Sequence, residues 1–367
     1  MIGKESQEGG LKGPQKARRR LIRAGQNQIK SLGLEGILSL LDQLVASATN
    51  FLTGVIVGRA CTKGDFGLYL LCFNILLLVI DLQNSLLAAP YTVMSQRSSG
   101  RQLCVYTGNS IVQQLFLGLV VAIMLKLAAI FIAPISPAFS GLPPVMDALA
   151  LAIAFIMLKE FIRRVCFAHL FMIRAFWLDL SVAAIQLLIL TFMFIRGTIS
   201  PKVVFWVMGF ACLSGVGGWL ILNRHIYSFS IKDFLGHFKK NWSFGSWLFG
   251  SSILWAVSMT LYPWILAYYH GPEATGVWGA CWGVVSLANP LMLGVQNFLG
   301  PRIVRAYAEF GISGLKFRVK WDSVLFFMLV LPFVALFLSV GGELTVMFYG
   351  QKYFGYSKVV QILALNL

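Results

Sequence analysis

Long apolar stretches, separated by short polar segments, dominate the pattern of this chain. A helix that crosses about 30 Å of hydrocarbon needs roughly 20 mainly apolar residues, and nine stretches are long enough. They cover residues 35–58, 68–90, 110–133, 148–170, 175–196, 203–223, 243–268, 276–299 and 323–347. The pattern predicts an all-α polytopic membrane protein with about nine full transmembrane helices.

A tenth apolar stretch begins near Tyr356 and stops with the sequence at Leu367. As a helix it would be about 18 Å long, which is too short to cross a bilayer. We therefore expect the C-terminal half of the protein to be incomplete, with a partial tenth helix as its last element.

The composition agrees with a membrane location. Hydrophobic residues make up 58% of the chain and charged residues 12%, and the mean hydropathy is +0.77. A soluble domain is about 45–50% apolar and about 25% charged. So few charged side chains argue against a soluble enzyme, a disordered chain and a fibrous protein.

Positive charge is distributed unevenly among the polar segments. The chain has 30 Lys and Arg, 14 Asp and Glu, and a formal net charge of +16. If the N-terminus lies in the cytosol, most of the basic residues fall in cytosolic segments, namely 1–33, 91–109, 159–174, 224–240 and 300–322. The positive-inside rule describes this bias. It predicts a cytoplasmic N-terminus, and it removes the reason to expect nucleic acid as a partner.

The sequence contains none of the common motifs of enzymes or metal sites. We find no Walker A loop, no G-x-S-x-G elbow and no H-E-x-x-H pair. The six cysteines have no paired spacing, which favours small core residues over disulfides or metal ligands. We expect neither an enzyme nor a nucleotide-driven pump, and no cofactor or metal.

An internal repeat relates the second apolar stretch to the eighth. The matching residues are Gly67, Pro90 and Gly100 in one copy, and Gly276, Pro301 and Gly311 in the other. The proline and the second glycine are 10 residues apart in both copies. Six spans separate the copies, so both have the same orientation, as in transporters built from two parallel lobes.

The repeat and the basic segments together predict four parts. Residues 1–33 form a basic cytoplasmic tail, and 34–223 form an N-lobe with the first six transmembrane helices. Residues 224–242 form a basic cytoplasmic linker, and 243–367 form an incomplete C-lobe with three helices and the start of a tenth.

Several motifs resemble those of a known group of membrane proteins. They are Asp42-Gln43, residues 50–54, Gly58-Arg59 and 65–69 in the first half, and residues 271–276, Asn289-Pro290, Pro301-Arg302 and 349–353 in the second. The chain resembles polysaccharide biosynthesis proteins, which are oligosaccharide flippase-type members of the multidrug/oligosaccharidyl-lipid/polysaccharide (MOP) exporter superfamily. The resemblance implies a MATE-like bundle of two six-helix lobes in a bacterial-type inner membrane, which exports a lipid-linked sugar by alternating access.

Polar residues inside predicted spans are the candidates for a transport cavity. Asp42 and Asn50 lie on the first helix, and Asp81 and Asn84 on the second. Both acids should lie in the cytosolic third of the membrane, where either could bind Na⁺ or H⁺ as a coupling ion. Alternatively, each acid pairs with a basic residue and only stabilises the bundle.

Other cavity candidates lie on later helices. Lys126 could face a cavity or extend to the membrane surface, and Trp255 and Tyr262 could stack on a sugar or only pack between helices. Asn289 and Asn297 flank a proline that opens the eighth helix. Arg163 and Arg164 could gather anionic headgroups, although a topological anchor is the simpler interpretation.

Three hypotheses of function remain open. The first is a flippase that exports a lipid-linked oligosaccharide or polysaccharide precursor, for which basic residues should face the cavity. Its partners would be membrane lipid, the saccharide substrate and the glycosyltransferases or polymerase of polysaccharide assembly. The second is a cation-coupled multidrug exporter of the same fold, which requires an acid-lined apolar cavity. The third is a truncated, transport-inactive scaffold.

Overall fold

The computed structural model describes residues 12–132 and 139–366, with side chains from Gly36 onward except at scattered positions between 256 and 309. These residues form helices and no strand, which confirms the predicted all-α class. The α-helices are α1 (Lys12–Ala60), α2 (Lys63–Gln83), α3 (Ala89–Ser95), α4 (Gly100–Ile132), α5 (Leu142–Ala168), α6 (Met172–Ile195), α7 (Pro201–Leu222), α8 (Ile231–Val285), α9 (Asn289–Tyr349) and α10 (Ser357–Ala364). A π-helical turn, η1 (Asn84–Ala88), joins α2 to α3, and 3₁₀ turns occur at η3 (Ser286–Ala288) and η4 (Gln351–Tyr353).

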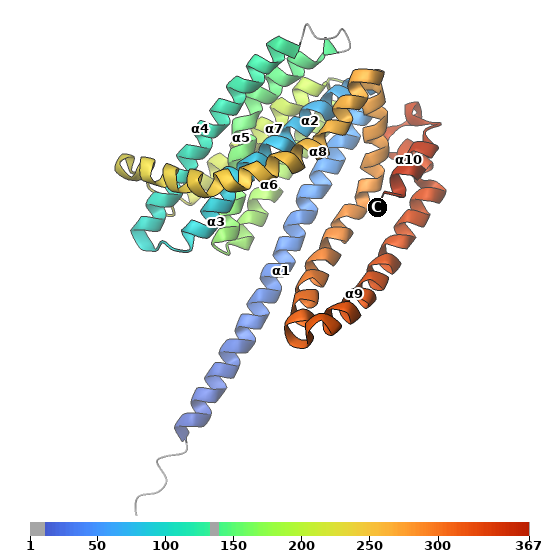
Figure 1. Cartoon of the computed structure of the whole chain (residues 1–367). Helices are drawn as coiled ribbons and strands as arrows, with labels where there is room; N and C mark the ends of the chain where they lie inside the picture. The colour runs from blue at the N-terminus through green and yellow to red at the C-terminus, as the bar shows by residue number, and fades with distance from the viewer. Residues whose placement is uncertain (1–11, 133–138, 367) are drawn as a thin grey trace, which may run out of the picture.

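Two glycines with non-helical backbone angles interrupt α8 and α9. Gly271 has a φ of 79° and Gly311 a φ of 62°, a left-handed conformation that glycine adopts readily. The chain reverses at both positions, as Figure 1 shows. If α2, η1 and α3 are counted as one continuous helix, Lys63–Ser95, six helices precede α8. Together with the three segments of α8 and α9 (231–270, 272–310 and 312–349) they confirm the predicted total of about nine in the described residues. We refer below to the Gly271 end and the Gly311 end of the bundle.

Burial and hydropathy agree with a protein embedded in a membrane. Among the described residues, seven helices are long and apolar enough to cross a bilayer. The helix α5 is not one of these seven, and most of its side chains are buried by the helices around it. Large apolar side chains such as Leu188 and Ile130 are exposed on the outside of the bundle, where lipid would cover them.

The first segment of α8 packs along helices of the predicted N-lobe. Tyr106 of α4 donates a hydrogen bond to the side chain of Asn241, with the two atoms 2.6 Å apart. The hydroxyls of Ser85 and Ser252 are 2.5 Å apart. The chain therefore leaves the predicted N-lobe after α7, but the helix that follows still contacts α2, η1 and α4.

The second segment of α8 crosses α2 where the two repeat copies match. A Cβ at Gly67 would overlap the carbonyl of Pro272, and a Cβ at Gly276 would overlap the carbonyl of Lys63. Because both residues are glycine, the two backbones can meet directly. The matching glycines of the repeat are thus in contact at the Gly271 end of the bundle.

Candidate functional site

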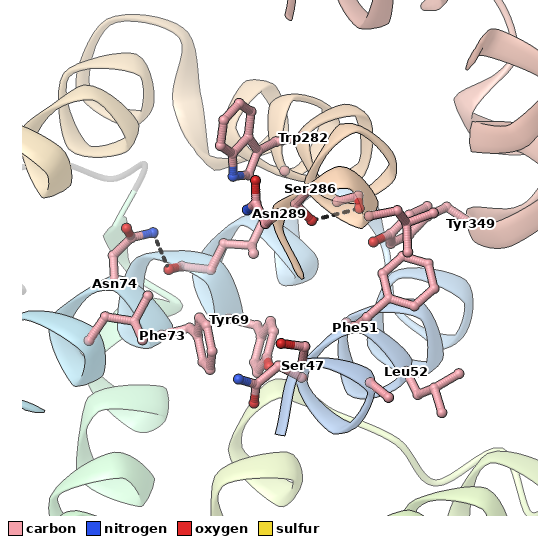
Figure 2. A pocket seen from close by; sticks show the side chains of 18 of the residues that line it. Ser47, Phe51, Leu52, Tyr69, Phe73, Asn74, Trp282, Ser286, Asn289 and Tyr349 are labelled. Atoms are coloured by element: carbon pink, nitrogen blue, oxygen red, sulfur yellow. Dashed lines mark hydrogen bonds between the residues drawn. The ribbon is translucent and has the colours of Figure 1, made fainter. Parts of the chain in front are cut away.

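A cavity of about 580 Å³ lies between α1, α2 and the segment from the end of α8 to the start of α9. Figure 2 shows part of its lining, which combines aromatic rings and small polar side chains with leucines such as Leu52. Helices α1 and α2 of the predicted N-lobe form one wall, and the segment around η3 in the predicted C-lobe forms the other. We call this space the interlobe cavity, and we refer to the two predicted parts as the first and the second lobe.

Aromatic rings form both walls of this interlobe cavity. Trp278 and Trp282 are one helical turn apart, and their rings stack in parallel with centroids 6.2 Å apart. On the opposite wall, Tyr69 and Phe73 of α2 stack in the same way at 5.8 Å. The cavity is thus bounded by two pairs of stacked rings, which present flat apolar surfaces to an occupant.

The polar groups of the cavity are uncharged. Asn50, Asn74 and Asn289 supply amides, and Ser47 and Ser286 supply hydroxyls. Asn74 donates a hydrogen bond to the carbonyl of Leu70 at 2.8 Å, which leaves its side-chain oxygen available. No Lys, Arg, Asp or Glu occurs among the described residues that line the cavity. Its wall can therefore form hydrogen bonds but offers no charge to an ionic ligand.

The structure places two of the predicted cavity residues, Asn50 and Asn289, in this lining. Asp81 is exposed on α2, outside the lining, and Asn84 lies in the π-helical turn. The side chain of Asn297 lies outside the described part of the structure.

Three further predicted cavity residues also lie away from the cavity. Lys126 forms an ion pair with Asp147 of α5 at 3.2 Å, and both side chains are about half exposed. Trp255 is 66% exposed on α8 and does not line the cavity. Tyr262 is also exposed and packs on the rear of Trp278, with ring centroids 5.5 Å apart. Their positions follow from helix rotation, which a sequence does not give.

A second polar site lies inside the first lobe. Asp42 of α1 is fully buried and accepts hydrogen bonds from the Nε and Nη2 atoms of Arg163, at 2.9 and 2.6 Å. Arg163 also approaches Asp179 of α6 at 2.8 Å. Lys159 lies 2.7 Å from Asp179 and 2.9 Å from Glu160. We call these five side chains the charge cluster.

The charge cluster contains three acids and two bases, so it carries one excess negative charge when all five are ionised. One oxygen of Asp42, Oδ1, is buried without a hydrogen-bond partner. A small cavity of about 100 Å³ adjoins the cluster and is lined by Lys159, Glu160, Asp179 and Asn50. Because Asn50 lines both cavities, it connects the cluster with the interlobe cavity.

The charge cluster bears on two predictions. For Asp42 the structure shows the alternative of a basic partner, Arg163. Arg163 itself is not free to gather headgroups, because its guanidinium is turned into the bundle and bound to acids. Its neighbour Arg164 points elsewhere on the helix and is exposed. Asp179 was not among the predicted site residues, although an acid inside an apolar span was a usable signal.

The family assignment rests on a sequence profile. The profile of the family described as polysaccharide biosynthesis protein matches residues 32–307. The chain belongs to this family. The resemblance to polysaccharide biosynthesis proteins stated from the motifs is thereby confirmed. A search of curated protein sequences found no match.

Solved structures show the same fold at low sequence identity. An inward-facing multidrug resistance MATE family transporter of the MOP superfamily has a TM-score of 0.67 and 15% identity, covering 87% of this chain and 74% of that one. A MOP superfamily transporter from Pyrococcus furiosus has a TM-score of 0.65 and 14% identity, with 92% and 76% covered. An outward-facing MATE transporter has a TM-score of 0.62 and 14% identity, with 92% and 78% covered. This protein therefore has the MOP transporter fold.

Proposed function

We propose that this family member is a flippase that moves a lipid-linked saccharide across the membrane by alternating access. The observation that carries the proposal is the interlobe cavity, whose wall combines stacked aromatic rings with amides and hydroxyls and has no charge among its described residues. No chemical step is needed, because the substrate is moved and not altered.

The cavity suits the physical problem of this transport. A sugar cannot enter hydrocarbon alone, because each polar group without a partner costs several kcal/mol. Asn50, Asn74 and Asn289 would replace water around its hydroxyls. Trp278 and Trp282 would cover the apolar face of a sugar ring. The neutral wall suits the sugar portion, so the phosphate link of the substrate would remain outside this part of the cavity.

A multidrug exporter is the second candidate, because similar structures are described as multidrug resistance transporters. An apolar cation would need an acid in the cavity wall, and the described lining residues include none. The acids nearest in the first lobe are bound to Arg163 and Lys159. The neutral wall therefore favours a sugar over a cationic drug, although it also lacks the bases that we expected for an anionic substrate.

Orientation and partners follow from the charge distribution. We place the Gly311 end in the cytosol of a bacterial-type inner membrane, since the basic segments 91–109, 159–174 and 224–240 lie toward that end. The substrate would enter there, beside the glycosyltransferases that make it, and would leave at the Gly271 end. A polymerase of polysaccharide assembly would act on it next.

We further propose that the charge cluster binds the coupling ion. Its excess negative charge would be neutralised by one Na⁺ or one H⁺, and the adjoining cavity of about 100 Å³ is large enough for a small ion. Asn50 would transmit the effect of ion binding from the charge cluster to the interlobe cavity, since it lines both cavities.

The flippase proposal is tested with purified protein in vesicles that contain a fluorescent lipid-linked oligosaccharide. We expect Trp282→Ala to slow translocation about tenfold, because one aromatic surface is lost. Trp247→Ala is the matched control, since Trp247 is 86% exposed and does not line the cavity. Equal rates in both variants would contradict the proposal. Efflux of cationic dyes without saccharide movement would favour the multidrug exporter, and no transport by the parent protein would favour the scaffold.

A further inference from the structure

Two helices from different lobes end side by side at the Gly271 end. The helix α1 ends at Ala60, and α9 ends at Tyr349. The last carbonyls of any helix lack partners within the helix, and that end carries partial negative charge. Both ends therefore need hydrogen-bond donors, preferably positively charged ones.

Each of these helix ends is capped by a basic residue from the other lobe. Arg59 donates hydrogen bonds to the carbonyls of Phe348 and Met347, at 2.7 and 2.5 Å. In return, Lys352 donates to the carbonyl of Arg59 at 3.3 Å and to that of Cys61. The contact is reciprocal, since each lobe gives one cation and receives another.

Tyr349 fills the space under this pair. Its ring occupies the gap left by Gly58 of α1, and its hydroxyl occupies the gap left by Gly283 of α8, so a Cβ at either glycine would overlap it. Phe66 of α2 packs against the same ring, with centroids 5.7 Å apart. Tyr349 is 2% exposed and is one of the residues that line the interlobe cavity.

We propose that Arg59, Lys352 and Tyr349 form a reversible latch that keeps the interlobe cavity closed at the Gly271 end. The inference rests on the proposed function in that it requires the lobes to separate during transport. Opening moves Tyr349 out from between the glycines and exchanges the hydrogen bonds across the lobes for bonds to water.

The chemistry of the latch suits repeated opening. Its two cations bind backbone carbonyls, and among the described residues neither lies within ion-pair distance of a carboxylate. Water can replace such partners when the lobes separate, so no charge is left buried. A third contact across the lobes, from Lys63 to the hydroxyl of Tyr356 at 3.3 Å, also joins a cation to an uncharged partner.

The experiment measures access to the cavity from each side of the membrane. Ser47→Cys places a thiol in the cavity wall, and a membrane-impermeant maleimide is added to sealed vesicles of either orientation. The protein without Ser47→Cys gives the background from its native cysteines. No saccharide is present, so the result reports on the latch even if the flippase proposal fails.

We expect Arg59→Gln and Lys352→Met each to raise the rate of labelling from the Gly271 side at least threefold. Lys202→Gln is the control, because Lys202 is an exposed cation at the start of α7 with no part in the latch. Parent-like labelling in both latch variants would overturn the proposal, provided that gel filtration shows both to be folded.

A second measurement does not depend on weakening the protein. Lys63→Cys and Tyr356→Cys place two thiols where side chains now meet across the lobes, and a short reducible cross-linker joins them. We expect the cross-linked protein to lose labelling of Ser47→Cys from the Gly271 side, and reduction to restore it. Labelling that persists in the cross-linked protein would also overturn the latch.

Discussion

Basic side chains hold helices together in two regions of this protein, and they bind different partners there. In the charge cluster, Arg163 and Lys159 bind carboxylates of the same lobe, deep among α1, α5 and α6. In the latch, Arg59 and Lys352 bind backbone carbonyls of the opposite lobe, close to the end of the bundle.

The difference separates a permanent contact from a temporary one. Pulling a buried ion pair apart leaves a charge without a partner, which is strongly unfavourable. Pulling a cation away from a helix end costs much less where water can reach both groups. The contacts within the first lobe should therefore survive the transport cycle, while those between the lobes should form and break in each cycle.

The largest effect is expected for Arg163→Gln. This change leaves Asp42, Glu160 and Asp179 with Lys159 as their remaining basic partner, and loss of one partner of a buried pair costs about 3–5 kcal/mol. Thermal unfolding in detergent should show a marked loss of stability. Arg164→Gln is the matched control, because Arg164 is next to Arg163 in the sequence but is exposed. Equal stability of the two variants would remove the distinction between cluster and latch.

Gly276→Ala should have the next largest effect. We expect it to impair closure of the interlobe cavity at the Gly271 end and to leave the folding of the first lobe unchanged. The added methyl group would overlap the carbonyl of Lys63, so α2 and α8 could no longer meet. We expect faster labelling of Ser47→Cys from the Gly271 side and about tenfold slower saccharide translocation. Gly217→Ala is the control, since nothing lies within 4 Å of its Cβ. Normal closure in Gly276→Ala would contradict the expected role of the crossing.

Asp42→Asn should change coupling more than stability. It would leave the cluster with two acids and two bases, so no excess charge remains for an ion to neutralise. Translocation should lose its dependence on the Na⁺ or H⁺ gradient. Asp81→Asn is the comparison, because Asp81 is exposed on α2 and forms no ion pair among the described residues. If Asp42→Asn keeps the full ion dependence, the cluster is not the coupling site.

The smallest effect is the pH dependence of the latch. Burial lowers the pKa of Lys352 below its ordinary value, so the closed latch holds that proton less tightly than an open, hydrated one. Raising the pH toward the ordinary lysine pKa of about 10.4 should therefore favour closure. The neutral amine still donates hydrogen bonds. At alkaline pH, labelling of Ser47→Cys from the Gly271 side should slow relative to the same measurement in Lys352→Met. A faster rate would contradict the expected direction of the pH dependence.

The helices, the family and the matching glycines could be predicted from the sequence because they depend on local pattern. The lengths of the apolar stretches predicted about nine helices. The internal repeat identified Gly67 and Gly276, which the structure brings into contact. The polar residues Asn50 and Asn289 were also predicted, and both line the cavity. In each case a short stretch of chain contains the signal.

The site was harder to predict because it depends on helix rotation and on partners distant in sequence. Trp255 was one of the candidates for the cavity, but it does not line it, whereas Trp278 and Trp282 do. The partner of Asp42, Arg163, follows it by 121 positions. The latch joins Arg59 to residues almost 290 positions later. No periodicity links such pairs, so packing alone reveals them.

The crossing of Gly67 and Gly276 also fixes the mechanics of the molecule. While the latch is closed, these two backbones are in direct contact with no flexible side chain between them, and we expect the helices to pivot there. From Gly67 to the end of α3 the chain is about 42 Å long as helix, so a rotation of about 10° moves its far end by about 7 Å. A small rotation beside the latch would thus produce a much larger displacement toward the Gly311 end. The size of this displacement depends on how far the two glycines lie from that end.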